Sequence, residues 1–357
     1  MQALDVCRNA ARYGMEMTLV CAGGGALEDE FRATGVDFVK LQRRLPIDPS
    51  LTSQLRKIIK DRDIDIVHGY QAVDGLHLYF ASRRITGLKT VLSFQGFIQD
   101  TKNRLASKYL IPRMDANIVV SRGLQKWLSE ESGLDTSKNF TVIYNGADPA
   151  RVKPTGKSIK VELGIPQETL LIGMIGSFYK DPRKNQLTLC KALPAIFAEI
   201  ENAHCVFAGR IESGAEEKYE QCVKFCQENG IADRVHFLGM RSDVPDILAA
   251  LDLFVFSSLH EGLPVAVSEA MLAGVPMIVS DIEPLLEATA NGRFAEVFPV
   301  KDVEALTGKM LMLMKDKGLR DDLAARALKH AEENFSIDAH MRELKKLYES
   351  LLTGAQA

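Results

Sequence analysis

The sequence predicts an α/β protein made of two doubly wound, Rossmann-like halves. A chain of 357 residues favours two domains. Short apolar runs, typical of buried parallel strands, alternate with longer segments of helical periodicity over residues 15–144 and again over residues 170–281. Between them lie Asp148-Pro149 and Lys153-Pro154-Thr155-Gly156, which are typical loop sequences, so we place the domain boundary near residue 150.

The first half opens with a helix over residues 2–13, which Gly14 ends. Strands are predicted at residues 15–21, 36–41, 64–68, 90–94, 116–120 and 140–144. Helices are predicted at residues 50–62, 75–86, 103–114 and 122–132. This regular alternation indicates a parallel sheet with helices on both faces.

The second half repeats the pattern. Strands are predicted at residues 170–175, 203–208, 234–239, 251–256 and 277–281. Helices are predicted at residues 186–199 and 216–229, and the tail over residues 335–352 is amphipathic.

The composition is that of a soluble globular protein, with 46% apolar and 25% charged residues. No apolar run is long enough to span a membrane, and the six cysteines form no CxxC pair, so we expect a reduced, cytoplasmic setting. Residues 1–150 carry 20 basic and 17 acidic side chains, and the remainder carries 24 and 30. This balance argues against a general nucleic-acid binder.

The most informative stretch is a strand–turn–helix unit at residues 251–271. Gly262 breaks the strand, and Pro264 suits the first turn of the following helix. A helix N-terminus attracts phosphate, whereas the flanking carboxylates of Glu261 and Glu269 would repel it and are suited to accept hydrogen bonds from hydroxyl pairs. A nucleotide sugar carries both groups. The alternative is an ordinary βα turn with a solvated Glu261 and a capping Glu269.

A family resemblance favours the nucleotide sugar. Glu261 and Glu269 are separated by seven residues, and residues 270–281 read Ala-Met-x-Ala-Gly-x-Pro-x-Ile-x-Ser-Asp. Together with Asn145-Gly146-Ala147-Asp148 at the linker, this pattern resembles the retaining glycosyltransferases of family 4 (glycosyl transferases group 1), which have the GT-B fold.

The resemblance implies two Rossmann-like domains facing a cleft. Residues 1–150 would form the acceptor-side domain, residues 151–334 the nucleotide-sugar-binding domain, and residues 335–357 a helix that crosses back to the first domain. Family members usually begin with a strand and a Gly-rich loop ahead of the helix predicted at residues 2–13, and neither is present here. Since the first strand of a doubly wound sheet is commonly central, we expect a gap in the middle of the first sheet.

The implied activity is transfer of a sugar from a UDP- or GDP-linked donor to a hydroxyl acceptor, with retained configuration and without metal or cofactor. The acceptor would be a sugar or a lipid-linked sugar in polysaccharide, lipopolysaccharide or glycolipid synthesis. The alternative is a nucleotide-sugar-binding protein with little or no transfer activity, because the opening strand and loop are missing.

The resemblance also assigns roles to single residues. Glu261 and Lys184 would be catalytic. Donor contacts would come from Glu269, Gly262, Leu263, Pro264, Val265, Arg183, Gly209, Arg210, Met240, Arg241 and Glu287. On the acceptor side we expect His68 and Gln95, although His68 can equally be a structural histidine and Gln95 stands where the family often has histidine.

Several of these positions depart from the family pattern. Ser177 stands where the family has a phosphate-binding arginine, so Arg183 or Lys180 is a candidate substitute, with a solvated surface charge as the alternative for Arg183. Lys184 matches the family lysine, whose flexible ammonium reaches phosphate oxygens. Met240 and Arg241 are expected to flank the base, and Asp243 to cap the following helix. Glu287 lacks the Gly-Gly that usually precedes it.

Two further segments have open interpretations. The helix predicted at residues 103–114 is basic, with apolar side chains interleaved, and can either be solvated or rest on the inner face of an anionic membrane as a peripheral contact. The run Gly23-Gly24-Gly25 lacks the spacing of a dinucleotide loop, so a plain loop is favoured.

Overall fold

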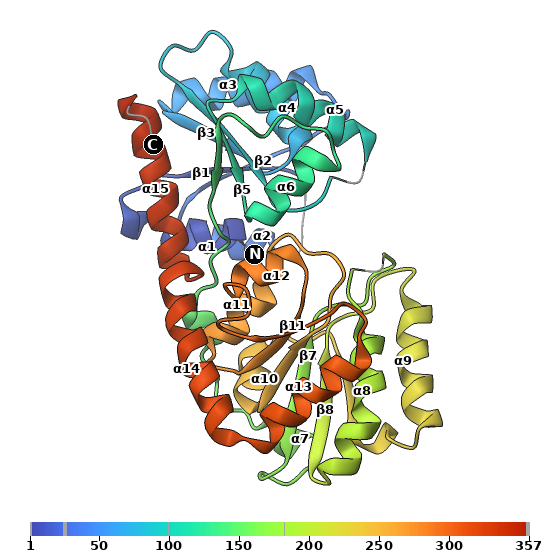
Figure 1. Ribbon diagram of the computed structural model, residues 1–357. Helices are drawn as coiled ribbons and strands as arrows, with labels where there is room; N and C mark the ends of the chain where they lie inside the picture. Colours follow the sequence, from blue (N-terminus) through green and yellow to red (C-terminus); the bar gives the residue numbers. More distant parts are fainter. Residues whose placement is uncertain (1, 24–26, 99, 182, 355–357) are drawn as a thin grey trace. The chain divides into compact units, whose positions relative to one another are not determined.

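A computed structural model describes residues 2–23, 27–98, 100–181 and 183–354. The chain divides into two compact units, one of Met1–Gly146 with Ile337–Ala357 and one of Ala147–Ser336 (Figure 1). Among the described helices, none combines the length and the apolar character that a membrane crossing requires.

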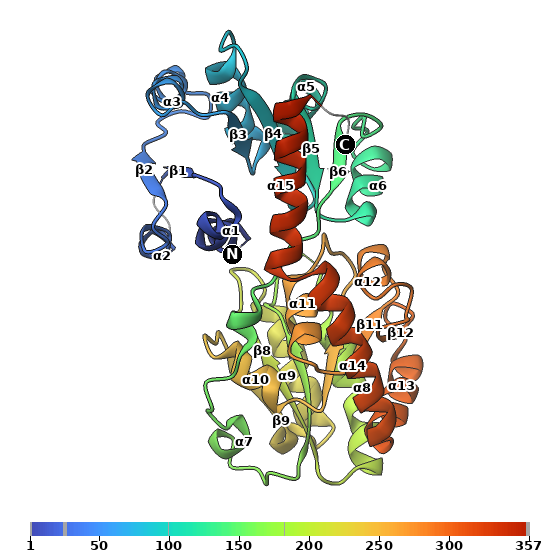
Figure 2. The ribbon, with the colours of Figure 1, turned by 90° about the vertical axis from the view of Figure 1, so that its left-hand side faces the viewer.

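The sheet of the first unit is in two pieces. Strands β1 (Thr18–Ala22) and β2 (Asp37–Leu41) form a parallel pair. Strands β3 (Ile66–Gly69), β4 (Lys89–Phe94), β5 (Ala116–Val119) and β6 (Phe140–Val142) form a separate parallel sheet in that order. Figure 2 shows the pair set apart from β3, and no ladder within the described ranges joins β1 to β3. This division is the gap expected of a doubly wound sheet without its central strand.

Helices of the first unit begin at side-chain caps in several places. The elements are α1 (Gln2–Asn9), η1 (Ala11–Tyr13), α2 (Glu28–Arg32), α3 (Pro49–Asp61), α4 (Ala72–Ser82), α5 (Thr101–Leu110), η2 (Ile111–Arg113) and α6 (Arg122–Glu130). Asp48, Asp100 and Ser121 accept first-turn N–H groups of α3, α5 and α6. The prediction of one continuous helix over residues 2–13 was wrong in detail. The α-helix ends at Asn9, a 3-10 turn follows, and Gly14 ends that turn with a backbone in the left-handed region.

The C-terminal helix α15 (Ile337–Thr353) belongs to the first unit. Its residues Met341, Leu344 and Leu347 join Val6 of α1 and Val91 of β4 in one buried apolar cluster. Apolar burial at about 25 cal/mol per Å² makes such a helix part of the core of this unit.

The second unit holds one continuous parallel sheet of six strands. They are β7 (Leu170–Ile175), β8 (Ala203–Ala208), β9 (Val235–Gly239), β10 (Leu253–Phe256), β11 (Met277–Ser280) and β12 (Glu296–Phe298). Their order is β12-β11-β10-β7-β8-β9, so the chain reverses direction across the sheet between β7 and β10. Open α/β sheets bind ligands outside the carboxyl ends of the strands at such a switch point. The sequence did not predict the three-residue β12.

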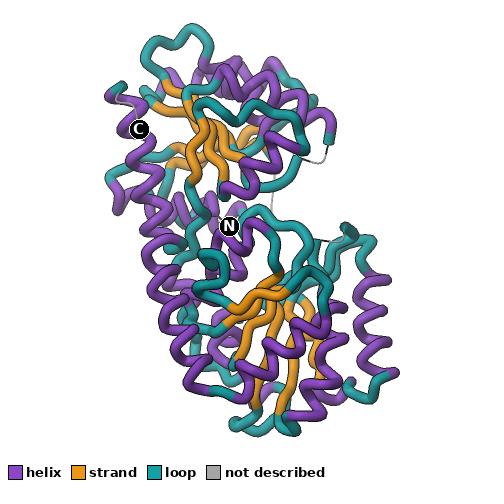
Figure 3. The backbone as a smooth tube through the Cα atoms, viewed as in Figure 1, coloured by secondary structure: helices purple, strands orange, loops and turns teal. Residues whose placement is uncertain are grey.

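Helices cover both faces of this sheet (Figure 3). They are η3 (Pro149–Val152), α7 (Ile159–Glu162), α8 (Gln186–Glu199), α9 (Glu216–Glu228), η4 (Ala232–Arg234), α10 (Val244–Ala250), α11 (Val265–Leu272), α12 (Glu283–Ala288), α13 (Val303–Lys315) and α14 (Lys317–Asn334). One apolar cluster of this unit lies between the sheet and α8, α9 and α13, and it includes the free thiols of Cys190, Cys205, Cys222 and Cys226.

Candidate donor site of the second unit

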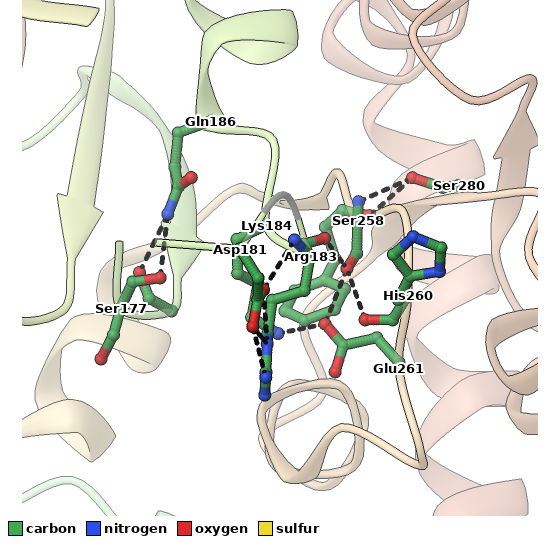
Figure 4. A network of polar contacts seen from close by, with 11 residues as sticks. Ser177, Asp181, Arg183, Lys184, Gln186, Ser258, His260, Glu261 and Ser280 are labelled. Atoms are coloured by element: carbon green, nitrogen blue, oxygen red, sulfur yellow. Dashed lines mark hydrogen bonds and ion pairs between the residues drawn. The ribbon is translucent and has the colours of Figure 1, made fainter. Parts of the chain in front are cut away.

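Two loops meet at the carboxyl ends of β7 and β10. The Leu259 N–H donates to the Arg183 carbonyl at 2.7 Å, and the Asn185 N–H donates to the Ser257 carbonyl at 3.1 Å. The Ser258 hydroxyl also donates to the Arg183 carbonyl (Figure 4). These bonds join the loop after β7 to the loop after β10, so residues far apart in the sequence share one site at the switch point.

An ion pair between Lys184 and Glu261 lies at the centre of this site. The Lys184 ammonium contacts Glu261 Oε1, and the side chains are only 9% and 10% exposed (Figure 4). Ser258 Oγ lies 2.7 Å from the same carboxylate oxygen, which is an alternative acceptor for its single proton, and the ammonium lies 4.1 Å from the centre of the Phe256 ring. Burial lowers the pKa of Lys184, and the Glu261 charge opposes that shift. The site therefore holds a desolvated cation whose ion-pair partner, among the residues that the structure describes, is the Glu261 carboxylate.

Helix α11 begins beside this pair. Pro264 is its N-cap rather than a first-turn residue, and it provides no side-chain acceptor. The first-turn N–H groups of a helix without a side-chain cap can bind an anion such as phosphate. Residues 262–265 thus lead from Glu261, the partner of Lys184, into a helix start suited to a phosphate.

Glu269 lies on α11 and forms an ion pair that the sequence pattern did not reveal. Arg151 of η3 donates from Nη2 to Glu269 Oε1 at 3.1 Å, and the Glu269 side chain is largely buried. The two residues are 118 positions apart, so no local pattern signals the contact. The pair fixes the orientation of the carboxylate on the helix.

Two family models match nearly the whole chain. Residues 157–330 match the glycosyl transferases group 1, and residues 1–151 match glycosyltransferase family 4. The chain is a family 4 glycosyltransferase.

Curated relatives and solved structures agree with this assignment. The chain is 25% identical over 351 residues to UDP-Gal:alpha-D-GlcNAc-diphosphoundecaprenol alpha-1,3-galactosyltransferase of Escherichia coli, covering 93% of this chain and 88% of the relative. It is 28% identical over 251 residues to the lipopolysaccharide core mannosyltransferase LpsB of Rhizobium meliloti, covering 69% and 68%.

The fold is confirmed by two solved structures. A glycosyltransferase from Rickettsia africae superposes with a TM-score of 0.86 at 17% identity, covering 99% of this chain and 95% of that one. HepE of Anabaena in complex with UDP and glucose superposes with a TM-score of 0.81 at 18% identity, covering 98% and 95%. The protein has the GT-B fold with two parallel-sheet, Rossmann-like domains.

Arg183 of this family 4 glycosyltransferase is held away from the role proposed for it. Its guanidinium donates two hydrogen bonds to the Asp181 carboxylate, from Nε at 2.8 Å and from Nη2 at 2.6 Å. It also lies over the Tyr179 ring, 4.6 Å from the ring centre. Asp181 raises the pKa of Arg183. That Arg183 binds the donor phosphate in place of the family arginine, which is Ser177 here, stays a prediction. It requires the Arg183 guanidinium to break its ion pair with Asp181.

Arg241 is part of a network of four charges. It donates to Glu162 at 2.6 and 2.9 Å and to Asp243 at 2.7 and 2.6 Å, and Lys157 pairs with both acids. Hydrogen bonds from Arg241 and Lys157 lower the pKa of Glu162 to about 2. Asp243 occupies the N-cap position of α10 as expected, but the expected side-chain cap bond is not formed, because its carboxylate pairs with these cations. The neighbouring Met240 is 75% exposed, and its role at the base stays a prediction.

Gly209 is required by a close approach of backbones. A Cβ atom there would lie 2.3 Å from the Gly176 carbonyl oxygen, so any side chain would push apart the ends of β7 and β8. Arg210, the next residue, is exposed and pairs with Glu212 at 2.6 Å. Glu287 is half-buried on α12. No group of three or more metal-ligating side chains is placed to bind an ion within the described ranges.

The acceptor-side candidates lie in the first unit. His68 on β3 is held at both ring nitrogens, by the Tyr348 hydroxyl at 2.7 Å and Ser93 Oγ at 2.6 Å, and it stacks on Tyr70. Burial, with a smaller contribution from His340, lowers the pKa of His68 to about 3, so the ring is neutral near pH 7. Gln95 follows the end of β4 and is half-buried. Gly24 and Gly25 of the glycine run are outside the described residues.

Proposed function

We propose that this family 4 glycosyltransferase transfers a sugar from a UDP- or GDP-linked donor to a hydroxyl acceptor with retained anomeric configuration. The observation that carries the proposal is the buried Lys184–Glu261 pair beside the start of α11. A cation and a helix N-terminus together stabilise the charge of a departing nucleoside diphosphate.

On donor binding, the Lys184 ammonium would exchange its Glu261 partner for the donor diphosphate. The donor diphosphate takes the Lys184 ammonium and the first-turn N–H groups of α11, with Gly262, Leu263 and Val265 lining the approach. Glu261 is then free to accept hydroxyl hydrogen bonds and orient the transferred sugar. Glu269, held by Arg151, accepts the ribose hydroxyls.

Transfer would proceed on one face of the sugar. The bond from the anomeric carbon to the phosphate oxygen breaks, and a bond to the acceptor oxygen forms on the same face. The departing phosphate oxygen takes the acceptor proton, so no protein nucleophile and no metal ion is needed. The protein contributes orientation and the fixed positive charge.

The acceptor class is suggested by the relatives. The Escherichia coli relative is named for a diphosphoundecaprenol acceptor, and two mycobacterial relatives are named phosphatidyl-myo-inositol mannosyltransferases. We therefore propose an activity in polysaccharide, lipopolysaccharide or glycolipid synthesis, at the cytoplasmic face of a membrane with lipid-linked acceptors.

A second function is favoured by the divided sheet of the first unit. With β1 and β2 separate from the other strands, the acceptor side can be incompetent while the second unit still binds a nucleotide sugar. The protein would then bind the donor with little or no transfer.

Calorimetry and turnover assays together test both functions. Wild type is expected to bind UDP or GDP, and Lys184→Ala should weaken that affinity on the order of 10- to 100-fold because a charge-assisted contact is lost. Lys191→Ala, on the exposed face of α8, is the matched control with unchanged affinity. Binding without donor hydrolysis or transfer would select the second function, and no nucleotide binding at all would refute both.

A further inference from the structure

Two histidines of the second unit form a pair outside the donor site. His204 is the second residue of β8, and His236 is the second residue of β9. Their rings stack with centres 5.3 Å apart and planes 7° apart, and His204 Nδ1 lies 3.0 Å from His236 Nε2. Both side chains are half-buried. The sheet therefore brings together two imidazole rings that no step of the proposed reaction uses.

The two strands hold both rings on one face of the sheet. Val206 is the register partner of His236, and His204 precedes Val206 by two positions, so the histidines are diagonal neighbours on adjacent parallel strands. Their chain neighbours Cys205 and Val235 point to the opposite face, where they join the apolar cluster with residues of α8 and α9. Because hydrogen-bonded strands fix both backbones, little ordering of the pair is needed when a ligand binds.

The facing nitrogens can share only one proton. Each neutral imidazole carries a single N–H and a single lone pair, so one N–H lies between His204 Nδ1 and His236 Nε2. The outer nitrogens, His204 Nε2 and His236 Nδ1, have no hydrogen-bond partner within the described ranges, and both rings are partly open to solvent. When both protons are on the outer nitrogens, the facing nitrogens present two lone pairs to the same space.

The distance between the facing nitrogens suits two ligands of one metal ion. Metal–imidazole bonds of about 2.0–2.1 Å place neighbouring nitrogens about 2.8–3.4 Å apart in octahedral or tetrahedral geometry. The 3.0 Å between His204 Nδ1 and His236 Nε2 lies in this range. Small rotations of the rings turn both lone pairs toward one ion, and water molecules complete its coordination. Imidazole nitrogen favours zinc, nickel and copper ions over Mg²⁺ or Ca²⁺.

The charges around the pair partly offset each other. Asp233, exposed in the turn before β9, acts on both rings, and its carboxylate has no hydrogen-bond or ion-pair partner among the residues that the structure describes. Arg234 acts on His204 with the opposite sign, but its guanidinium donates to the carbonyls of Phe197 and Glu201 at the end of α8. An ion at the pair therefore has one acid nearby and a base that is engaged elsewhere.

We propose that His204 and His236 form a binding site for a divalent transition-metal ion of the zinc, nickel or copper type. The ion takes the place of the shared proton, which moves to an outer nitrogen, so neither ring changes its charge. It joins the edge strand β9 to β8. His204 lies four residues before the carboxyl end of β8, a rise of about 13 Å, so the ion is remote from the donor loops. Metal binding and nucleotide binding can therefore fail independently.

Calorimetry with Ni²⁺ and Zn²⁺ tests the site on the full chain, purified without a histidine tag. Wild type should bind a single ion of either metal with a dissociation constant below about 1 mM, and it should not bind Mg²⁺. His204→Gln and His236→Gln should each weaken binding on the order of tenfold or more, because a second ligand on the same ion adds its affinity at high effective concentration. Asp233→Asn should weaken binding about two- to fivefold, the effect of one exposed charge.

A matched control and melting curves separate the site from folding. His330→Gln removes a half-buried histidine of α14 and should bind metal as wild type does. Without metal, every variant should melt cooperatively by circular dichroism, which shows that it is folded. Ni²⁺ at about tenfold its dissociation constant should raise the melting temperature of wild type by roughly 3–6 °C and leave that of His204→Gln unchanged.

Three results would overturn the proposal. Wild type could bind neither Ni²⁺ nor Zn²⁺. The two glutamine variants could bind as tightly as wild type, which would place the ion elsewhere, for example at the half-buried thiol of Cys21. Mg²⁺ could bind as tightly as Ni²⁺, which would indicate attraction by surface acids rather than coordination by imidazole.

Discussion

The two units contain the same type of sheet in different states of completion. In the second unit six strands form one ladder, and all residues of β10 and β11 are buried. In the first unit the strands form two sets, and every residue of β1 is only half-buried. A continuous, buried sheet supports a preformed polar site, whereas strands with unpaired edges have low local stability.

Because of this contrast, the polar side chains with the most fixed geometry are those of the donor site in the second unit. The donor-site residues lie on loops that close over adjacent strands, and their ion pair is buried. In the first unit His68 serves to hold β3 to α15 and β4 through Tyr348 and Ser93. The single tryptophan, Trp127, lies in the first unit. Its fluorescence therefore reports the unfolding of the first unit, whereas circular dichroism reports the unfolding of both units.

The strongest way to break the second unit is to remove one member of its buried pair. Lys184→Ala leaves the Glu261 carboxylate desolvated and should lower the free energy of unfolding of this unit by about 3–5 kcal/mol. The double variant Lys184→Met/Glu261→Met should recover most of that loss, because no uncompensated charge remains. Denaturant unfolding followed by circular dichroism measures both, and a Lys184→Ala variant as stable as wild type would contradict the buried pair.

The close approach of β7 and β8 gives the next largest effect. Gly209→Ala places a methyl group against the Gly176 backbone and should cost about 1–3 kcal/mol in the second unit. Gly308→Ala, in the interior of α13 with open space around the added atom, is the matched control and should stabilise by about 0.5–1 kcal/mol. Equal unfolding midpoints for the two variants would argue against the backbone approach.

The stability of the first unit should depend on pH through His68. Its pKa is about 3 in the folded state against an ordinary histidine value of 6.5, so below pH 6.5 the unfolded state binds the extra proton. The stabilising effect of neutral His68 is therefore complete above pH 6.5 and is lost as the pH falls, by about 1.4 kcal/mol per pH unit at most. Trp127 fluorescence melts between pH 7 and pH 5 should show this slope in wild type and a reduced slope in His68→Asn; parallel slopes would contradict it.

The exposed ion pair that joins α15 to η1 should have the smallest effect. Arg12 Nη1 contacts Asp338 Oδ1 at 2.8 Å, but the arginine is 65% exposed. Arg12→Ala should cost about 0.2–1 kcal/mol, in contrast to the buried Lys184 pair. A loss of several kcal/mol in Trp127 unfolding would show that α15 depends on this contact more than on its apolar face.

The sequence was sufficient for strands β1 to β11 and for the βα turn of the donor site, but not for β12. Apolar runs such as residues 253–256 are buried strands, and the Gly/Pro turn leads into α11 as predicted. Patterns of this kind are local, so a single sequence reports them.

Contacts between distant residues could not be predicted in the same way. The Lys184–Glu261 pair joins residues 77 positions apart, and the Arg151–Glu269 pair joins residues 118 apart. Asp243 had the spacing of a cap, but two nearby cations compete for its carboxylate. Tertiary electrostatics overrides a local preference at each of these positions.

Hydrogen exchange with and without UDP or GDP, at a concentration that saturates wild type but leaves Lys184→Ala mostly unbound, tests the central claim most directly, because it locates the donor on the chain. The account predicts slower exchange over residues 176–186 and 257–272, at the switch point of the second unit, in wild type and not in Lys184→Ala. Slower exchange confined to the first unit, or none over these two segments when nucleotide is bound, would contradict it.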